Sequence, residues 1–93
     1  MIRSFADRET EKIWSGIRSR KLPMEIQNRA LVKLRLLNNA RHLDDLRVPP
    51  GNRLEALAGD RLGQFSIRIN DQWRICFRWQ NGVPFDVEIT DYH

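Results

Sequence analysis

The chain has 93 residues, the size of one domain, which we expect to span residues 1–93. Sixteen Lys and Arg residues oppose twelve Asp and Glu residues, so the formal net charge is +4, and thirteen of the sixteen are Arg. Such a balance is typical of proteins that bind nucleic acid, an acidic partner or an anionic membrane, although a basic surface can also be merely solvated. A domain this small favours a shallow surface groove over a deep enclosed pocket.

Several classes of protein are excluded by features that the sequence lacks. No apolar run is long enough to span a bilayer and no signal peptide follows Met1, so we expect a cytoplasmic protein with no membrane partner. The single Cys76 excludes a disulfide framework and a zinc-binding cysteine cluster. His42 and His93 are far apart in sequence, and the glycines are scattered rather than gathered in a phosphate-binding loop. We therefore expect no metal and no cofactor.

The first elements are predicted to be a short strand and a helix. Residues 1–5 favour the strand, and Asp7 is placed to cap the helix that follows it. Apolar residues recur at helical spacing in this helix and form one stripe, made of Ile13, Trp14 and Ile17.

A second helix is predicted between Pro23, which suits the first helical turn, and about Ala40. One face of this helix is apolar and consists of Ile26, Ala30, Leu34 and Leu37. Three basic residues are expected to point toward water: Arg29, Lys33 and Arg35. Residues 42–46 predict a short helical turn, and residues 47–52, with two prolines and a glycine, predict the main loop of the domain.

From Asn52 onward apolar residues alternate with polar ones, which indicates β-strands. Strands are predicted over residues 53–57, 65–69, 73–79 and 85–89, with a turn at residues 58–60 and another at residues 70–71. The sequence Gln80-Asn81-Gly82 is the strongest hairpin signal in the chain.

The alternation divides the sheet into two faces. One face collects the large apolar residues: Phe65, Ile67, Ile69, Trp73, Ile75, Phe77, Trp79, Phe85, Val87 and Ile89. The other face carries Ser66, Arg68, Arg74, Arg78, Asp86 and Glu88. Only the two helices can cover the apolar face. We therefore predict an α+β fold in which two N-terminal helices pack on one face of a mainly antiparallel sheet, with the opposite face open to solvent.

The open face is predicted to carry a cationic floor made of Arg68, Arg74 and Arg78. Three guanidinium groups on one side of a sheet can hold a phosphate backbone. The alternative interpretation pairs them with nearby carboxylates in cross-strand ion pairs. The two interpretations are compatible if one arginine is in an ion pair while another is available. Arg68 and Arg74 are the better candidates for binding the substrate.

The three residues after the last strand, Asp91, Tyr92 and His93, are also candidates for chemistry. His is well suited to acid–base catalysis near neutral pH, and Tyr can stack on a base or move a proton. Continued alternation places Tyr92 on the same face as Arg68 and Arg74. A terminal tripeptide is by itself a weak signal, because chain ends often fray.

Taken together, these residues resemble HigB-type toxins of the RelE/ParE superfamily. The resemblance covers nearly the whole chain and rests on five stretches: Met1–Phe5, Asn52–Leu57, Gly59–Arg61, Gln64–Ile75 and Asp91–His93. Trp73-Arg74 and the terminal Asp-Tyr-His are the more specific parts. The resemblance implies a RelE-like fold whose open sheet face is the active face.

The resemblance also implies a function and partners. A toxin of this kind belongs to a type II toxin–antitoxin system, enters the ribosomal A site and cuts the mRNA there without a metal ion. In the implied reaction the ribose 2′-hydroxyl attacks the adjacent phosphorus, and a cyclic phosphate results. The implied partners are the ribosome, mRNA and a HigA-type antitoxin with a helix-turn-helix domain. Operator DNA is reached only indirectly, through the antitoxin complex.

The resemblance also implies catalytic residues, which are assigned to the matching positions of this sequence. Arg74 matches the family arginine that neutralises the transition state. Asp91, Tyr92 and His93 match the terminal catalytic trio, with the roles of base and acid unassigned and Asp91 orienting its neighbours. Glu55 stands where some members have a histidine, and it is either a general base or an ion-pair partner.

Two further positions depart from the family pattern. A family lysine falls on Ala58, and a second active-face arginine falls on Asn70, where Arg68 can supply the charge. The residues that we predict to bind RNA are Arg53, Arg68, Asn70 and Arg78. Because a missing stabilising group costs on the order of a hundredfold in rate, a mild toxin is expected.

Three functions are weighed. The first is the mRNA endonuclease, which Arg74 and the terminal trio favour. The second is an inhibitor of translation or ribosome assembly that does not cut, which the missing histidine and lysine leave open. The third is a ParE-like gyrase poison, which shares the fold but lacks the terminal trio.

Overall fold

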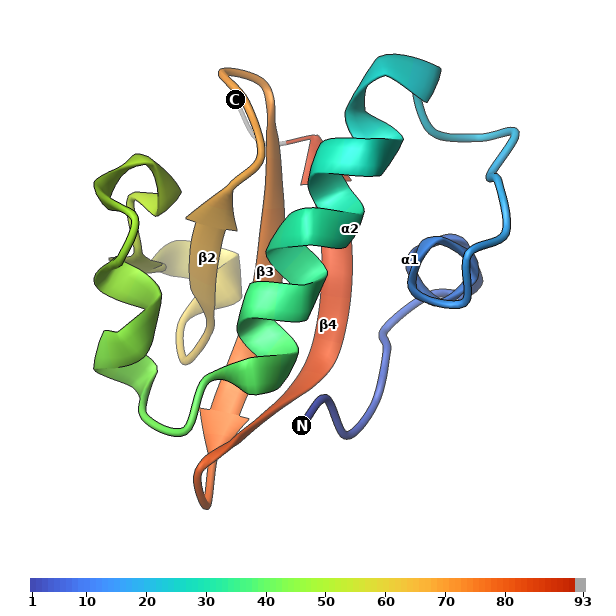
Figure 1. Cartoon of the computed structure of the whole chain (residues 1–93). Helices are drawn as coiled ribbons and strands as arrows, with labels where there is room; N and C mark the ends of the chain where they lie inside the picture. Colours follow the sequence, from blue (N-terminus) through green and yellow to red (C-terminus); the bar gives the residue numbers. More distant parts are fainter. Residues whose placement is uncertain (92–93) are drawn as a thin grey trace.

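The computed structural model describes residues 1–91 and confirms the α+β architecture (Figure 1). Its helices and strands are α1 (Arg8–Trp14), α2 (Met24–Asn39), β1 (Glu55–Ala56), β2 (Phe65–Arg68), β3 (Trp73–Gln80) and β4 (Val83–Asp91). Three short 3-10 helices lie between α2 and β2: η1 (Leu43–Arg47), η2 (Pro50–Asn52) and η3 (Gly59–Arg61). The four strands form one sheet in the order β1-β2-β3-β4, and every neighbouring pair is antiparallel.

The core lies between α2 and one face of the sheet, and Figure 1 shows α2 crossing this face while α1 lies beside β4. The apolar face of α2 is buried as predicted, through Ile26, Ala30, Leu34 and Leu37. It packs against sheet residues that are also buried, among them Ile67, Ile75 and Phe77. The hydroxyl oxygen of Thr10 in α1 accepts a hydrogen bond of 2.9 Å from the backbone N–H of Ile89. No helix within residues 1–91 combines the length and the apolarity that a membrane span requires.

The first helix is shorter than predicted. It ends at Trp14, and Gly16 follows with a φ of +80°, a left-handed conformation that suits glycine. Ile17 therefore leaves the apolar stripe, and 57% of it is exposed. Asp7 occupies the N-cap position, but its side chain makes no capping hydrogen bond.

The predicted first strand, residues 1–5, is only a single bridge. Phe5 pairs with Val87 in parallel fashion, supported by backbone hydrogen bonds of 2.9 Å from Arg3 to Pro84 and from Ala6 to Val87. The ladder goes no further because β4 is interrupted at this point by a β-bulge. The register shifts between Cys76 and Arg78 of β3.

The bulge also removes Phe85 from the core face, where alternation had placed it. Asp86 has a φ of +51°, and one residue of β3 is opposed by two residues of β4. Beyond the bulge Phe85 pairs with Arg78, and Pro84 becomes the buried residue. Directly opposed residues share a face, so Phe85 lies on the Arg78 side.

The second face of the sheet is less open than predicted. Ser66 and Cys76 are fully buried, and Arg74 is only 8% exposed. Figure 1 shows the segment between η2 and β2, drawn in yellow, folded behind β2. Its strand β1 is two residues long, whereas five were predicted. An ion pair of 3.1 Å between Arg61 of η3 and Glu88 of β4 closes the middle of the face.

Candidate active site

An open groove of about 420 Å³ lies at one end of the second sheet face. It is lined by Arg53, Glu55, Arg68, Asn70, Asp71 and Arg74. Five of the nine residues predicted for the site therefore meet in one place, namely all of these except Asp71. Three guanidinium groups and two carboxylates give the lining a formal net charge of +1. Such a groove suits an anionic ligand.

Strand pairing brings these residues together. Arg68 of β2 stands directly opposite Arg74 of β3, and Glu55 of β1 stands opposite Ser66 of β2. Opposed residues in an antiparallel pair project on the same side of the sheet. The groove is thus defined by the register of three consecutive strands, β1, β2 and β3.

Arg74 forms the floor of the groove and is held from several sides. Its Nε donates to the hydroxyl of Ser66 at 2.7 Å, and its Nη2 donates to the carbonyl of Arg53 at 2.6 Å and to that of Ser66 at 3.4 Å. A carboxylate oxygen of Glu55 lies 3.7 Å from Nη2. Nη1 has no acceptor within residues 1–91. The guanidinium is therefore fixed in place while one nitrogen keeps its donors available.

The backbone of Arg53 is shaped to hold Arg74. Arg53 has a φ of +44°, which is uncommon for a residue with a side chain, and its carbonyl is the acceptor for Nη2. The preceding residue, Asn52, is fully buried and donates to the carbonyls of Leu46 and Val48 at 3.1 and 3.3 Å. The loop before β1 is thus anchored internally, and the side chain of Arg53 stays exposed.

The two remaining lining residues of β2 and its turn have different roles. The guanidinium of Arg68 pairs with the carboxylate of Asp71, a residue whose side chain is 98% exposed. Exposed ion pairs contribute little, so an incoming phosphate can displace Asp71. Asn70 accepts hydrogen bonds from the backbone N–H groups of Gln72 and Trp73 at 2.9 and 2.7 Å. Asn70 therefore builds the turn between β2 and β3 with its own carbonyl oxygen.

Arg78 lies outside the groove. Its Nε is 3.7 Å from a carboxylate oxygen of Asp86, across the bulge, and its side chain is 40% exposed. This agrees with the ion-pair interpretation of this residue. Arg74 is the more strongly held of the two arginines.

Asp91 also lies outside the groove lining, at the end of β4. It stands opposite Trp73 in the register, so it projects on the face away from Arg74. Its carboxylate accepts a hydrogen bond of 3.0 Å from the side chain of Gln72. The other members of the predicted trio, Tyr92 and His93, lie outside the described residues.

Besides Asp71, two residues with a part in the site were not among the predicted ones. Ser66 was assigned to the polar face, but nothing in the alternation indicated that its hydroxyl would hold Arg74. Lys33 was expected to point toward water, whereas its Nζ donates to the side-chain oxygen of Asn52. Burial, and then the charges of Arg29 and Arg68, lower the pKa of Lys33 below its ordinary value of 10.5.

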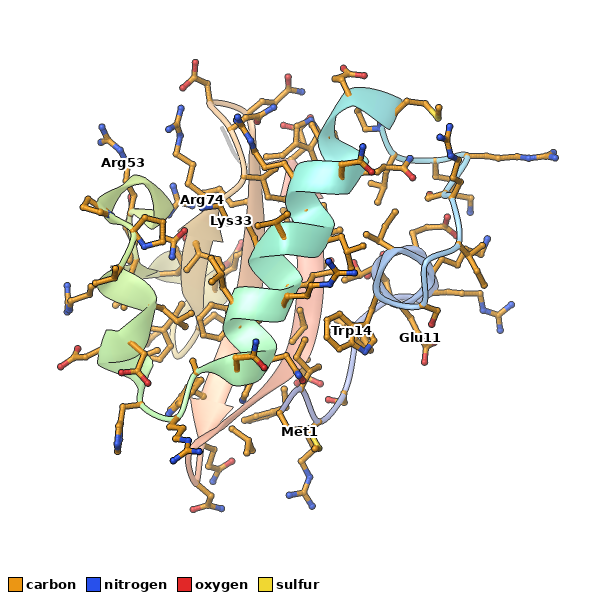
Figure 2. The ribbon with its side chains drawn as sticks, viewed as in Figure 1. Met1, Glu11, Trp14, Lys33, Arg53 and Arg74 are labelled. Atoms are coloured by element: carbon orange, nitrogen blue, oxygen red, sulfur yellow. The ribbon has the colours of Figure 1, made fainter. Side chains whose placement is uncertain are left out.

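Figure 2 shows Lys33, Arg53 and Arg74 on the β2 side of α2, away from Trp14 and Glu11 of α1. In the described part of the chain, no three His, Cys, Asp or Glu side chains come close enough together to hold a metal ion. What the groove offers chemically is a set of positively charged donors around one fixed guanidinium.

A short α+β chain with two helices on one face of an antiparallel sheet, and a basic groove on the other, matches the RelE-like class of toxins. The chain belongs to the HigB-like toxin family, the RelE-like toxins of type II toxin–antitoxin systems, whose family model matches residues 3–93.

Two named relatives are similar over their whole length. Toxin HigB-1 of Vibrio cholerae is 42% identical over 93 residues, which cover 99% of this chain and 98% of the relative. Endoribonuclease HigB of Proteus vulgaris is 28% identical over 93 residues, which cover all of both chains. An uncharacterized protein of Haemophilus influenzae is 33% identical over 61 residues, 66% of this chain and 60% of the relative.

Proposed function

We propose that this toxin is an endoribonuclease that cuts mRNA in the ribosomal A site by a metal-independent reaction and so inhibits translation. The observation that carries this proposal is the guanidinium of Arg74, which is buried and fixed in a basic groove while its Nη1 has no acceptor within residues 1–91. The name of the relative from Proteus vulgaris, an endoribonuclease, supports the reaction class.

The proposed reaction needs stabilisation of negative charge more than a strong nucleophile. The 2′-hydroxyl loses its proton, and the 2′-oxygen forms a bond to the adjacent phosphorus. The bond from phosphorus to the 5′-oxygen breaks, and that oxygen takes up a proton. The products are a 2′,3′-cyclic phosphate and a 5′-hydroxyl. Arg74 neutralises the charge that develops on the phosphoryl oxygens, and a prearranged donor contributes most because it does not reorganise during the reaction.

The proton transfers are assigned to residues around Arg74. Glu55 is half-exposed and lies 3.7 Å from Nη2 of Arg74, so it is placed either to take the 2′-proton or to orient the guanidinium. Tyr92 and His93 are proposed to transfer protons to or from the reacting oxygens, and Tyr92 to stack on the nucleotide. For Asp91, the bond from Gln72 supports an orienting role at the end of β4.

RNA binding is proposed to rest mainly on Arg53 and Arg68, which line the groove with exposed or displaceable guanidinium groups. Asn70 contributes by holding the turn that carries one wall of the groove. Arg78 is proposed to contact the backbone only at a distance from the reacting phosphate, since it pairs with Asp86.

Toxins of type II systems act together with an antitoxin, and we propose a HigA-type antitoxin as the partner of this chain. The further proposed partners are the ribosome and its mRNA, with operator DNA reached only through the antitoxin complex. The proposed site of action is accordingly the cytoplasm.

A second candidate function is inhibition of translation without cutting. What favours it is the family resemblance: Glu55 falls where it implies a histidine in some members, and Ala58 falls where it implies a lysine. If neither proton transfer nor charge stabilisation reaches a useful level, a tightly bound toxin would still block the A site.

The experiment is to map mRNA ends by primer extension after the toxin is expressed in cells that lack the antitoxin. New ends within codons, shortly after growth stops, are expected for the endonuclease. Halted translation without new ends would favour the inhibitor that does not cut. Intact translation with damaged DNA would instead indicate a gyrase poison and overturn both proposals.

A further inference from the structure

The basic groove does not end at the sheet, because two cations of α2 approach it from the side. Nη1 of Arg29 lies 3.4 Å from the carbonyl of Ile69, the residue that follows β2. Nζ of Lys33 donates to the side chain of Asn52, the residue before Arg53. Arg29 and Lys33 are four residues apart, so they share one side of the helix.

Within residues 1–91, neither of these two cations has a carboxylate within ion-pair distance. Their hydrogen-bond acceptors within residues 1–91 are uncharged oxygens, a backbone carbonyl for Arg29 and an amide for Lys33. Other basic residues are paired, such as Arg61 with Glu88 and Arg78 with Asp86. Arg29 donates to the carbonyl of Ile69, which follows Arg68 in the chain. Burial lowers the pKa of Lys33 most, and the charges of Arg29 and Arg68 lower it further.

We propose that Arg29, Lys33 and Arg68 form a second phosphate-binding site, which holds the RNA backbone beside the phosphate that is placed at Arg74. The proposal rests on the proposed function, because it extends the path of the same RNA strand. Arg68 belongs to both sites: it lines the groove, and Arg29 reaches the carbonyl of Ile69, the residue next to Arg68 in the chain. The RNA would run from the groove around the outer side of β2 toward α2.

RNA fits this surface better than an acidic peptide does, because the cluster is continuous with the groove and is built mainly of guanidinium groups. A guanidinium offers forked donors that match phosphate oxygens. Three cations of like charge repel one another, and a bound phosphate relieves that repulsion. A backbone phosphate also carries no sequence information, so this site strengthens binding without selecting codons.

The test compares Arg29→Gln and Lys33→Gln with Arg35→Gln, a matched control on the same helix. Arg35 is exposed and two residues from Lys33, so it projects on a different side of α2. Binding is measured to ribosomes programmed with an mRNA whose reacting ribose lacks the 2′-hydroxyl, over a series of salt concentrations. Cleavage of the normal mRNA is measured in parallel, and thermal melting checks each fold.

We expect each of the two variants to weaken binding by roughly three- to tenfold and to reduce the salt dependence by about one ion per lost phosphate contact. Arg35→Gln, the matched control, is expected to bind and to cleave like the unmodified protein. Lys33→Arg keeps the charge and is expected to keep the affinity, which separates charge from a structural role of the Lys33–Asn52 bond.

Equal affinity and equal salt dependence in Arg29→Gln and Arg35→Gln would overturn the second phosphate site, whatever happens to cleavage. Weaker binding to the antitoxin, with unchanged binding to ribosomes, would overturn it in favour of a protein partner. Binding of the unmodified toxin without cleavage of normal mRNA would overturn the endonuclease proposal instead, and the binding comparison would still decide this site.

Discussion

Arg74 and Arg78 stand on the same strand and on the same face of the sheet, yet their surroundings differ. Arg74 is buried, bonded to Ser66 and to the carbonyl of Arg53, and lines an open groove. Arg78 is partly exposed and has one long ion pair, with Asp86. The difference teaches that position on a face does not make a site. A cation becomes suited to catalysis where the surrounding chain fixes it and leaves it accessible.

The largest difference between Arg74 and Arg78 is expected in toxicity, when the guanidinium of each is removed. Arg74→Ala is expected to abolish growth inhibition, because the groove loses its fixed donor and at least about a hundredfold in cleavage rate. Arg78→Ala, the matched variant at the other end of the face, is expected to remain toxic. Circular dichroism must show that both variants fold, since a buried arginine also has a structural part. Full toxicity of Arg74→Ala would remove Arg74 from the site.

The next largest loss of toxicity is expected from removal of Tyr92 and His93. A chain that ends at Asp91, without Tyr92 and His93, is expected to lose toxicity while its melting temperature stays close to that of the full chain. Asp91→Asn is expected to have a smaller effect, because Asp91 projects away from Arg74 and is bonded to Gln72. Growth assays and thermal melting measure both. A toxic truncated chain would contradict the proposed proton-transfer role of Tyr92 and His93.

The support of each arginine can be tested separately. Ser66→Ala removes a buried acceptor of Arg74 and is expected to lower the free energy of unfolding by about 1–3 kcal/mol and cleavage by about tenfold. Ser4→Ala, at the bulge, removes a more exposed hydroxyl that contacts Asp86 and is expected to cost less than about 1 kcal/mol. Urea denaturation compares the two, and equal losses would contradict the stronger anchoring of Arg74.

The smallest expected effect is on folding stability at alkaline pH, through Lys33 beside the groove. The folded-state pKa of Lys33 lies below the unfolded value, so the unfolded chain binds more protons in the interval between them. The contribution of Lys33 to stability therefore becomes more favourable as pH rises through this interval. When the free energy of unfolding is measured against pH, that of the unmodified protein should rise relative to that of Lys33→Met. A constant difference between the two would contradict the cationic cluster.

Much of the fold could be predicted from the sequence because its signals are local. Helical spacing identified the buried face of α2, and strict alternation identified the hairpin of β3 and β4 with its Asn81-Gly82 turn. The same alternation misplaced Phe85, because a bulge at Asp86 shifts the register without a glycine to indicate it. Local patterns also could not reveal that the segment after η2 folds back over the second face.

For the candidate site, too, local signals could be predicted from the sequence and contacts between separate segments could not. All the residues that line the groove, except Asp71, were recognised from their types, their strand positions and the family resemblance. Their bonding was not, because it depends on contacts between distant segments. The hydroxyl of Ser66 and the carbonyl of Arg53 hold Arg74, and neither contact leaves a pattern in the sequence. Lys33 was missed for a similar reason, since its partner Asn52 lies in η2, 19 residues further along the chain.

The most direct test of the central claim is a single-turnover cleavage rate on ribosomes programmed with one mRNA, for Arg74→Lys and Arg78→Lys. Both substitutions keep the positive charge, but lysine has one nitrogen in place of the separate, fixed nitrogens with which Arg74 bonds the Ser66 hydroxyl and the Arg53 carbonyl and still faces a phosphate. Arg74→Lys is predicted to cut at least about a hundredfold more slowly than the unmodified toxin, and Arg78→Lys to cut within about threefold of it. Equal rates for the two variants would contradict the claim that the fixed guanidinium of Arg74 is the centre of the site.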